Sequence, residues 1–199
     1  MKRLQSLNTR LVLAACGLAL LVAAAPASAA DPAITVGSYY LAANTAHQPI
    51  AIRVAGVSSV GMFNLNAQIA TGTGTSFPVF DGVDLTTGTI FAPDHLDPLD
   101  TGSAPRLATW SILTASGTLS SAEGLLATLY IDTTGVSSGI YSLSLGDTLN
   151  GPTAFYDAAG LPQNPAITIT EGSFTIVPEP ASAALFLLAA PTLLRRRKR

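Results

Sequence analysis

The sequence predicts an all-β protein whose body is a single antiparallel β-sandwich. Three observations lead to this fold class. Apolar residues alternate with polar ones in many short runs, which is the pattern of strands buried on one face. Turn-forming residues such as Gly, Asn and Asp separate these runs. No window long enough for a core helix keeps a 3.6-residue period, so the strands have only each other to pack against.

The first 29 residues predict a secretory signal peptide, because a cationic start, an apolar stretch and small residues follow one another. The cations are Lys2, Arg3 and Arg10. The apolar stretch covers 11–25. The small side chains of Ala27, Ala29 and Ala30 suit signal peptidase, and we expect cleavage after Ala29 or Ala30.

A bacterial lipoprotein signal is the alternative at this end, since Leu13-Ala14-Ala15-Cys16 has the pattern of small residues before a cysteine. Only five apolar residues separate Arg10 from Cys16, fewer than the roughly 7 to 15 of an ordinary apolar zone. With a secretory signal Cys16 is removed, and it is the only cysteine. The mature protein would then have neither disulfide nor thiol chemistry.

The predicted sandwich covers residues 30–176. Its clearest strands are 49–54 and 63–69, and on the second the apolar residues alternate with three amide side chains. The same alternation predicts strands at 107–113, 125–131, 139–145, 166–170 and 173–177. Turn signals lie at 81–82, 137–139, 150–152, 157–160 and 171–172, and one helical turn is expected over 120–123.

The body is strongly acidic although the whole chain has a net charge of only −2. Between residues 30 and 180 only Arg53 and Arg106 stand against all 12 acidic residues, a net charge of −10. Such a body offers no electrostatic surface for nucleic acid or for anionic lipid. The sequence therefore argues against nucleic-acid binding.

The last 23 residues fall into three parts. These are Val177, Pro178, Glu179 and Pro180; an apolar run at 181–194; and Arg195, Arg196, Arg197, Lys198 and Arg199. As a helix, this 14-residue run would span about 21 Å, which is shorter than the roughly 30 Å hydrocarbon core of a bilayer. The terminal cations should stay cytoplasmic and leave the acidic body outside, so the segment can tether the chain until it is cut.

This tail resembles the PEP-CTERM sorting signal of Gram-negative bacteria. The resemblance implies recognition by a membrane-embedded exosortase, removal of the tail, and delivery to the cell surface or to an extracellular polysaccharide matrix. Pro191 departs mildly from an uninterrupted apolar helix. A plain C-terminal membrane anchor is the alternative.

The order of the body's strands resembles a cohesin-like domain. The segments that carry the resemblance are 34–38, the strand ending at Val54, 56–57 leading into 63–69, then 124–131, 139–145, 155–157 and 171–176. The resemblance implies a jelly-roll sandwich related in shape to carbohydrate-binding modules, and it makes a dockerin-like protein a possible partner. The segment 71–75 departs from the family, and we carry over no binding residues.

The sequence gives little support for catalysis. The mature body has only two histidines, His47 and His95, and contains no serine-hydrolase elbow, no zinc-protease motif and no phosphate-binding glycine loop. Acidic residues gather at Asp94, Asp97 and Asp100 in a loop broken by proline. Clustered carboxylates suit calcium, but the spacing is not that of an EF-hand, and a solvated acidic loop is the alternative.

Trp110 is the only tryptophan, and alternation places it on one face with Ala108 and Ile112. This position predicts a core residue, with stacking on a sugar as the alternative. Taken together, the sequence predicts an exported, non-enzymatic surface or matrix protein without a cofactor, with a structural or adhesive role. The alternative is a cohesin-like or carbohydrate-binding module with a specific protein or glycan ligand.

Overall fold

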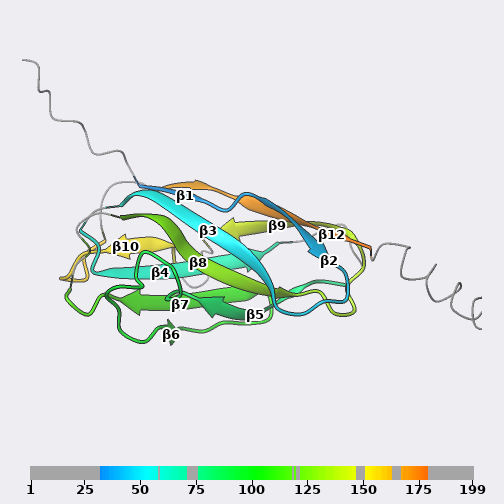
Figure 1. Cartoon of the computed structure of the whole chain (residues 1–199), viewed down its shortest axis with the longest axis horizontal. Helices are drawn as coiled ribbons and strands as arrows, with labels where there is room; N and C mark the ends of the chain where they lie inside the picture. The colour runs from blue at the N-terminus through cyan, green and yellow to red at the C-terminus, as the bar shows by residue number, and fades with distance from the viewer. Residues whose placement is uncertain are drawn as a thin grey trace, which may run out of the picture. The chain divides into compact units, whose positions relative to one another are not determined.

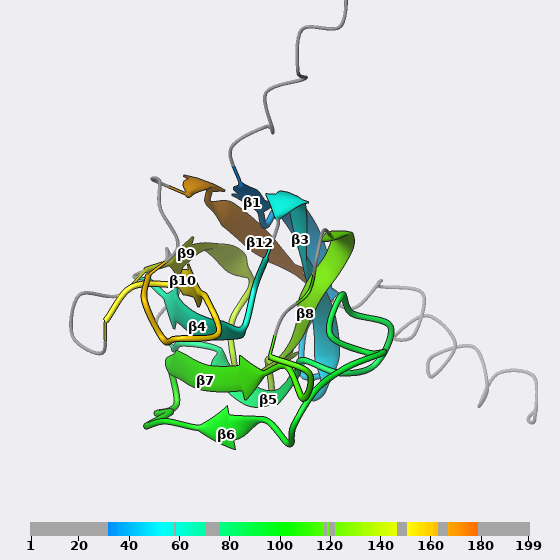
Figure 2. The same cartoon turned by 90° about the vertical axis from the view of Figure 1, so that its left-hand side faces the viewer.

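The computed structural model describes residues 32–57, 59–70, 76–117, 119, 122–146, 151–162 and 167–178. In this part of the chain every regular element is a β-strand, and the strands form two facing sheets, which Figure 2 shows end-on. The predicted all-β sandwich is confirmed. The predicted signal peptide, apolar C-terminal helix and basic tail lie outside the described residues. The described part contains no helix of the length and apolarity needed to span a bilayer.

The two sheets have five and seven strands. The first has the order β11 (Thr168–Thr170), β1 (Ala33–Thr35), β3 (Gln48–Val57), β8 (Ala122–Asp132) and β5 (Val79–Asp84). The second has the order β2 (Ser38–Ala42), β12 (Gly172–Val177), β9 (Gly139–Leu145), β4 (Met62–Ile69), β7 (Leu107–Leu113) and β6 (Leu99–Asp100), and β10 (Ala154–Tyr156) also pairs with β4.

The core lies between the sheets and is made by the inward side of each strand. On β3, Ile50 and Ile52 are fully buried, as their alternation predicted. On β4, Phe63 packs against Phe155 of β10, with 4.9 Å between ring centroids. Burying one such side chain stabilises the fold by about 1.5–3 kcal/mol, so the facing residues of the two sheets are what hold the sandwich together.

The first and last strands change sheets side by side, along the upper edge of the molecule in Figure 1. The pairs β1–β11 and β2–β12 are parallel, whereas the other pairings between described strands are antiparallel as predicted. The amide of Val36 donates to the carbonyl of Thr170 (3.1 Å), and that of Ser173 to the carbonyl of Gly37 (3.0 Å). The segment 34–38, which carries part of the cohesin resemblance, is divided between β1 and β2, because the chain changes sheets within it.

Strand β5 lies where the sequence predicted a turn, at Asp81 and Gly82. Its register with β8 shifts between Phe80 and Gly82, which makes this a β-bulge. A Cβ at Gly82 would lie 3.4 Å from the ring of Tyr130, an ordinary van der Waals distance, so the bulged strand runs beside that ring. The helical turn predicted over 120–123 was also wrong, since its last two residues begin β8.

Three strands end in an aspartate whose carboxylate accepts hydrogen bonds from the following turn. These are Asp84, Asp100 and Asp132, at the ends of β5, β6 and β8. Asp100 Oδ1 accepts from the amides of Gly102 (2.9 Å) and Ser103 (2.8 Å). The other two accept from the amide two positions ahead, at 2.8 and 2.7 Å. Each carboxylate thus satisfies turn amides that have no strand partner.

These hydrogen bonds favour the ionised carboxylate, so the pKa of each aspartate is lowered from its ordinary value. At Asp100 the cause is the amide of Gly102, followed by that of the next residue. At Asp132 it is the side chain and then the amide of Thr134. At Asp84 burial raises the pKa, but the hydrogen bonds from the following threonines outweigh it.

We expect Gly172→Ala to destabilise the protein by about 1–3 kcal/mol, the usual cost of overpacking. A Cβ at Gly172 would lie 2.4 Å from the carbonyl oxygen of Gly37 and 2.4 Å from Val36 Cγ1. Backbone must therefore move where both terminal strands cross. Urea unfolding measures the effect, and Ser173→Ala, which adds no atom on the same strand, is the control. Equal stability of the Gly172→Ala variant and the parent would contradict the crossover geometry.

We also expect stability to fall in acid because of the turn-capping aspartates. A lowered pKa in the folded state stabilises the fold above the ordinary Asp pKa of about 3.9, and this contribution is lost as pH falls through the lowered value. The melting temperature should be level from about pH 7 to 5 and fall below about pH 4.

The control for this acid effect is a matched aspartate. Asp132→Asn should make the fall in melting temperature shallower. Asp97→Asn should leave it unchanged, because the exposed Asp97 side chain makes no hydrogen bond within the described residues. If the melting temperature falls equally in acid for Asp132→Asn and the parent, the turn-capping aspartates do not cause that fall.

Candidate binding groove

The three aspartates predicted as a calcium site do not share a site. Asp94 accepts hydrogen bonds from the side chain and the amide of Ser116, which lower its pKa, with the side-chain bond the larger cause. Asp100 caps its own turn, and Asp97 is exposed. Within the described ranges no three His, Cys, Asp or Glu side chains come close enough to hold a metal ion. The geometry therefore gives the calcium hypothesis no support.

The two histidines lie at opposite ends of the sandwich. The amide of His47 donates to Asp81 Oδ2 (2.8 Å), and its ring stacks on Tyr130 with 3.9 Å between centroids. This is the end where β3 begins. His95 Nδ1 lies 3.0 Å from the carbonyl oxygen of Phe91, in a loop that is hydrogen-bonded to the end of β7. The histidines therefore do not converge on one site.

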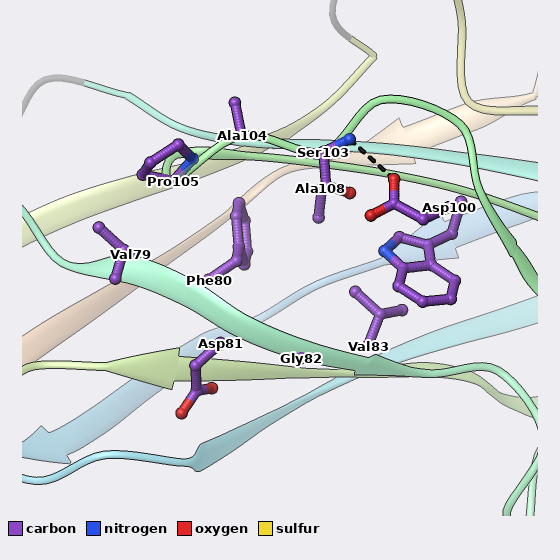
Figure 3. Close-up of a pocket in the computed structure, with 11 residues that line it drawn as sticks. Val79, Phe80, Asp81, Gly82, Val83, Asp100, Ser103, Ala104, Pro105 and Ala108 are labelled. Atoms are coloured by element: carbon purple, nitrogen blue, oxygen red, sulfur yellow. Dashed lines mark hydrogen bonds between the residues drawn. The ribbon is translucent and has the colours of Figure 1, made fainter.

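A groove of about 450 Å³ lies at the open edge of the sandwich, between β5 of one sheet and β6 and β7 of the other. Figure 3 shows its two walls. One is built from Val79, Phe80 and Val83 of β5, and the other from Ser103, Ala104 and Pro105 of the loop after β6. Small-molecule sites in proteins commonly have volumes of roughly 300–1,000 Å³. The groove has the size of a ligand site.

Trp110 lines this groove from β7. It pairs in register with Leu65 of β4, and its neighbours on the inward face, Ala108 and Ile112, are buried at 1% and 0% exposure. Trp110 itself is only half-buried and packs against the edge of the core. The prediction of a core position is thus correct for the face and wrong for full burial, because the side chain lines the groove at the edge of the sandwich.

Backbone hydrogen bonds fix the wall opposite β5. The amide of Phe80 donates to the carbonyl of Pro105 (2.8 Å), which ties the loop to β5 across the groove. The amide of Thr101 donates to the carbonyl of Thr109 (2.9 Å), and the amide of Thr109 donates to the hydroxyl of Ser103 (3.0 Å). The groove is therefore formed before any ligand arrives, which lowers the entropic cost of binding.

The ionisable residues that line the groove are both acidic, Asp81 and Asp100. Asp81 points to the opposite side of β5 from Phe80, as Figure 3 shows, and its Oδ2 is bonded to the amide of His47. Asp100 Oδ1 accepts hydrogen bonds from two turn amides, and the side chain of Ser103 also bonds to the carboxylate. A carboxylate has about four acceptor positions, so it can accept a further hydrogen bond from a ligand.

The nearest cation along the chain, Arg106, does not offset this charge. Its Nε donates to the carbonyl of Ile69 (3.2 Å), and its guanidinium lies 4.6 Å from the centre of the Phe77 ring. The groove therefore keeps a negative character.

Sequence reasoning missed the groove because its residues come from distant segments. Phe80 and Val83 belong to a strand that the sequence predicted as a turn, and Pro105 lies in a connecting loop. The Asp100 turn carries the one local signal, since an aspartate followed two positions later by glycine is typical of such a cap. For Trp110 the sequence leaves both a core position and stacking on a sugar open, because the same alternation fits a buried ring and a half-buried one.

Among known proteins, no family profile and no curated protein matches the chain, but solved structures do. A non-cellulosomal cohesin from Archaeoglobus fulgidus is 18% identical, with 74% of this chain and 92% of that chain covered and a TM-score of 0.54. The seventh ScaB type I cohesin from Pseudobacteroides cellulosolvens is 12% identical, with 75% and 94% covered and a TM-score of 0.55.

A chain of a type I cohesin–dockerin complex from Clostridium thermocellum, Coh-OlpC-Doc435, gives a similar result. It is 15% identical, with 78% of this chain and 99% of that chain covered and a TM-score of 0.54. At these identities the likeness shows the fold. The body of this protein is a cohesin-like β-sandwich.

Proposed function

We propose that this protein is exported, sorted through its C-terminal signal and retained outside the cell as a non-enzymatic binding module. The observation that carries the binding role is the likeness of the body to cohesins, one of which was solved in a cohesin–dockerin complex. A dockerin-like protein or an extracellular polysaccharide is the partner that this role calls for. A structural or adhesive role in the matrix is the broader form of the same proposal.

The limits of the sandwich support processing at both ends. The first strand begins at Ala33, just after the expected cleavage at Ala29 or Ala30. The last strand ends at Val177, the first residue of the sorting motif. Signal peptidase and an exosortase can therefore remove both ends without cutting a described strand. Before the second cut, the apolar segment would tether the chain to the inner membrane.

Two features of the body support a non-enzymatic role that involves no nucleic acid. His47 and His95 are held at opposite ends of the sandwich, so the two side chains cannot act together in one catalytic site. The acidic excess of the body disfavours binding to a phosphate backbone. Both features support the proposed role in recognition at the surface or in the matrix.

We expect the protein recovered from cells and medium to begin near Ala30 or Asp31 and to end near Pro180, because both signals are removed. Terminal sequencing and intact mass measure this. Glu179→Ala should leave the tail attached and shift the protein to the membrane fraction. Glu171→Ala, an exposed acid ahead of the last strand, is the control and should be processed normally. A parent chain that still ends at Arg199 in the membrane fraction would contradict sorting and favour a permanent anchor.

A further inference from the structure

The groove combines an aromatic wall with a carboxylate at its rim. Trp110 and Phe80 line it together with apolar side chains, and both rings are half-buried, so part of each ring remains accessible. The face of an aromatic ring carries partial negative charge and attracts the weakly positive C–H groups of an apolar surface. A sugar ring has such a C–H face, and its hydroxyl groups lie around the rim.

Asp100 is placed to accept a hydrogen bond from a hydroxyl or ammonium group. Its Oδ1 is fixed by the amides of Gly102 and Ser103, and the Ser103 side chain also bonds to the carboxylate, which orients the group. A carboxylate has about four acceptor positions, so one remains for a ligand. The same bonds lower its pKa, so the group stays ionised at all but strongly acidic pH. Bonds to an ionised acceptor are stronger than those between neutral groups. The groove thus offers an aromatic surface for the C–H face of a sugar and a fixed acceptor for one of its hydroxyl groups.

The edge of the groove does not suit an added peptide strand. A peptide that extends a sheet needs a regular row of free amides and carbonyls on the edge strand. On β5 the amide of Phe80 is taken by the carbonyl of Pro105, and the strand is bulged between Phe80 and Gly82. The backbone of β5 is therefore interrupted in the middle of the groove wall.

The negative charge at the groove disfavours acidic sugars. Asp100 is the carboxylate on the groove side, since Asp81 points to the opposite side of β5 from Phe80 and Arg106 is turned toward Ile69 and Phe77. A uronate or a sulfated sugar would bring a like charge next to Asp100, which is unfavourable. An amino sugar would bring an ammonium group that can pair with it.

We propose that this groove binds a saccharide without acidic groups, either a neutral sugar or an amino sugar, by stacking on Trp110 and bonding to Asp100. The proposal depends on the binding role given under Proposed function and names its ligand class and site. It does not depend on the sorting signal. Failure of processing at Pro180 would leave it standing, and failure of sugar binding would leave the sorting proposal standing.

The single tryptophan allows a direct test, because the intrinsic tryptophan fluorescence of the whole chain comes from Trp110. The protein as purified from its cells would be titrated with a neutral glucan oligosaccharide, a chitosan oligosaccharide and an alginate oligosaccharide. We expect a saturable change with glucan, chitosan or both, and affinity for alginate that is weaker by roughly tenfold or more, owing to the like charge. No saturable change with either of the first two would overturn the proposal.

Three variants locate the binding, with calorimetry as the measurement. Trp110→Leu keeps apolar volume but removes the ring face, and it should weaken binding by roughly tenfold. Asp100→Asn keeps an oxygen that can accept the hydrogen bonds of the turn amides. Because it removes the negative charge, it should weaken the binding of chitosan more than that of glucan. Tyr40→Ala alters an aromatic side chain on β2 that is 80% exposed and does not line the groove, and it should leave the affinities unchanged.

Two further outcomes would overturn the proposal. Affinities that are unchanged in both groove variants, or lost in Tyr40→Ala alone, would place sugar binding on another surface. A cationic peptide that competes fully with the bound saccharide, and binds more tightly than it, would make the groove a peptide site. Because Asp100→Asn keeps the turn, a normal melting curve for this variant ensures that lost binding is not lost folding.

Discussion

The structure depends on apolar burial between two sheets that no helix covers within the described residues and that no disulfide can join, because the chain has a single cysteine. Ile50 and Ile52 of one sheet and Phe63 of the other are fully buried in the same core cluster. Within the second sheet, Tyr141 stacks on Phe174 with 5.5 Å between ring centroids. Such a core needs alternation on every strand, because a slip of one residue would turn each apolar side chain to solvent. The fold is therefore specified by many short segments that agree with one another.

The same requirement explains where the polar chemistry lies. With the interior apolar, the aspartates sit where strands end and turn amides need acceptors, as at Asp84, Asp100 and Asp132. Acidic residues that look like a metal or catalytic cluster in the sequence are thus distributed over separate turns. The groove lies between β5 and the strands β6 and β7, and there the turn-capping carboxylate of Asp100 comes beside Trp110. A residue used for folding thereby becomes available for recognition.

The sequence predicts well those features that depend on one segment at a time. The faces of β3 and β4 and the sandwich itself follow from the alternation in each strand. The change of sheet within 34–38, the bulge at Gly82 and the half-exposure of Trp110 do not, because each depends on which strands meet in space. The groove belongs to this second kind. The signal peptide and sorting tail lie outside the described residues and stay predictions.

The parallel terminal strands determine how the body would respond to mechanical force. Pro32 and Pro178 lie at opposite ends, since β1 begins beside the end of β3 and β12 ends beside the end of β2, close to where β3 begins. Tension between them runs along β1–β11 and β2–β12. It loads their interstrand hydrogen bonds together in shear, whereas a hairpin pulled from one end opens bond by bond. A module held at one terminus and pulled at the other would therefore resist extension through its first and last strands.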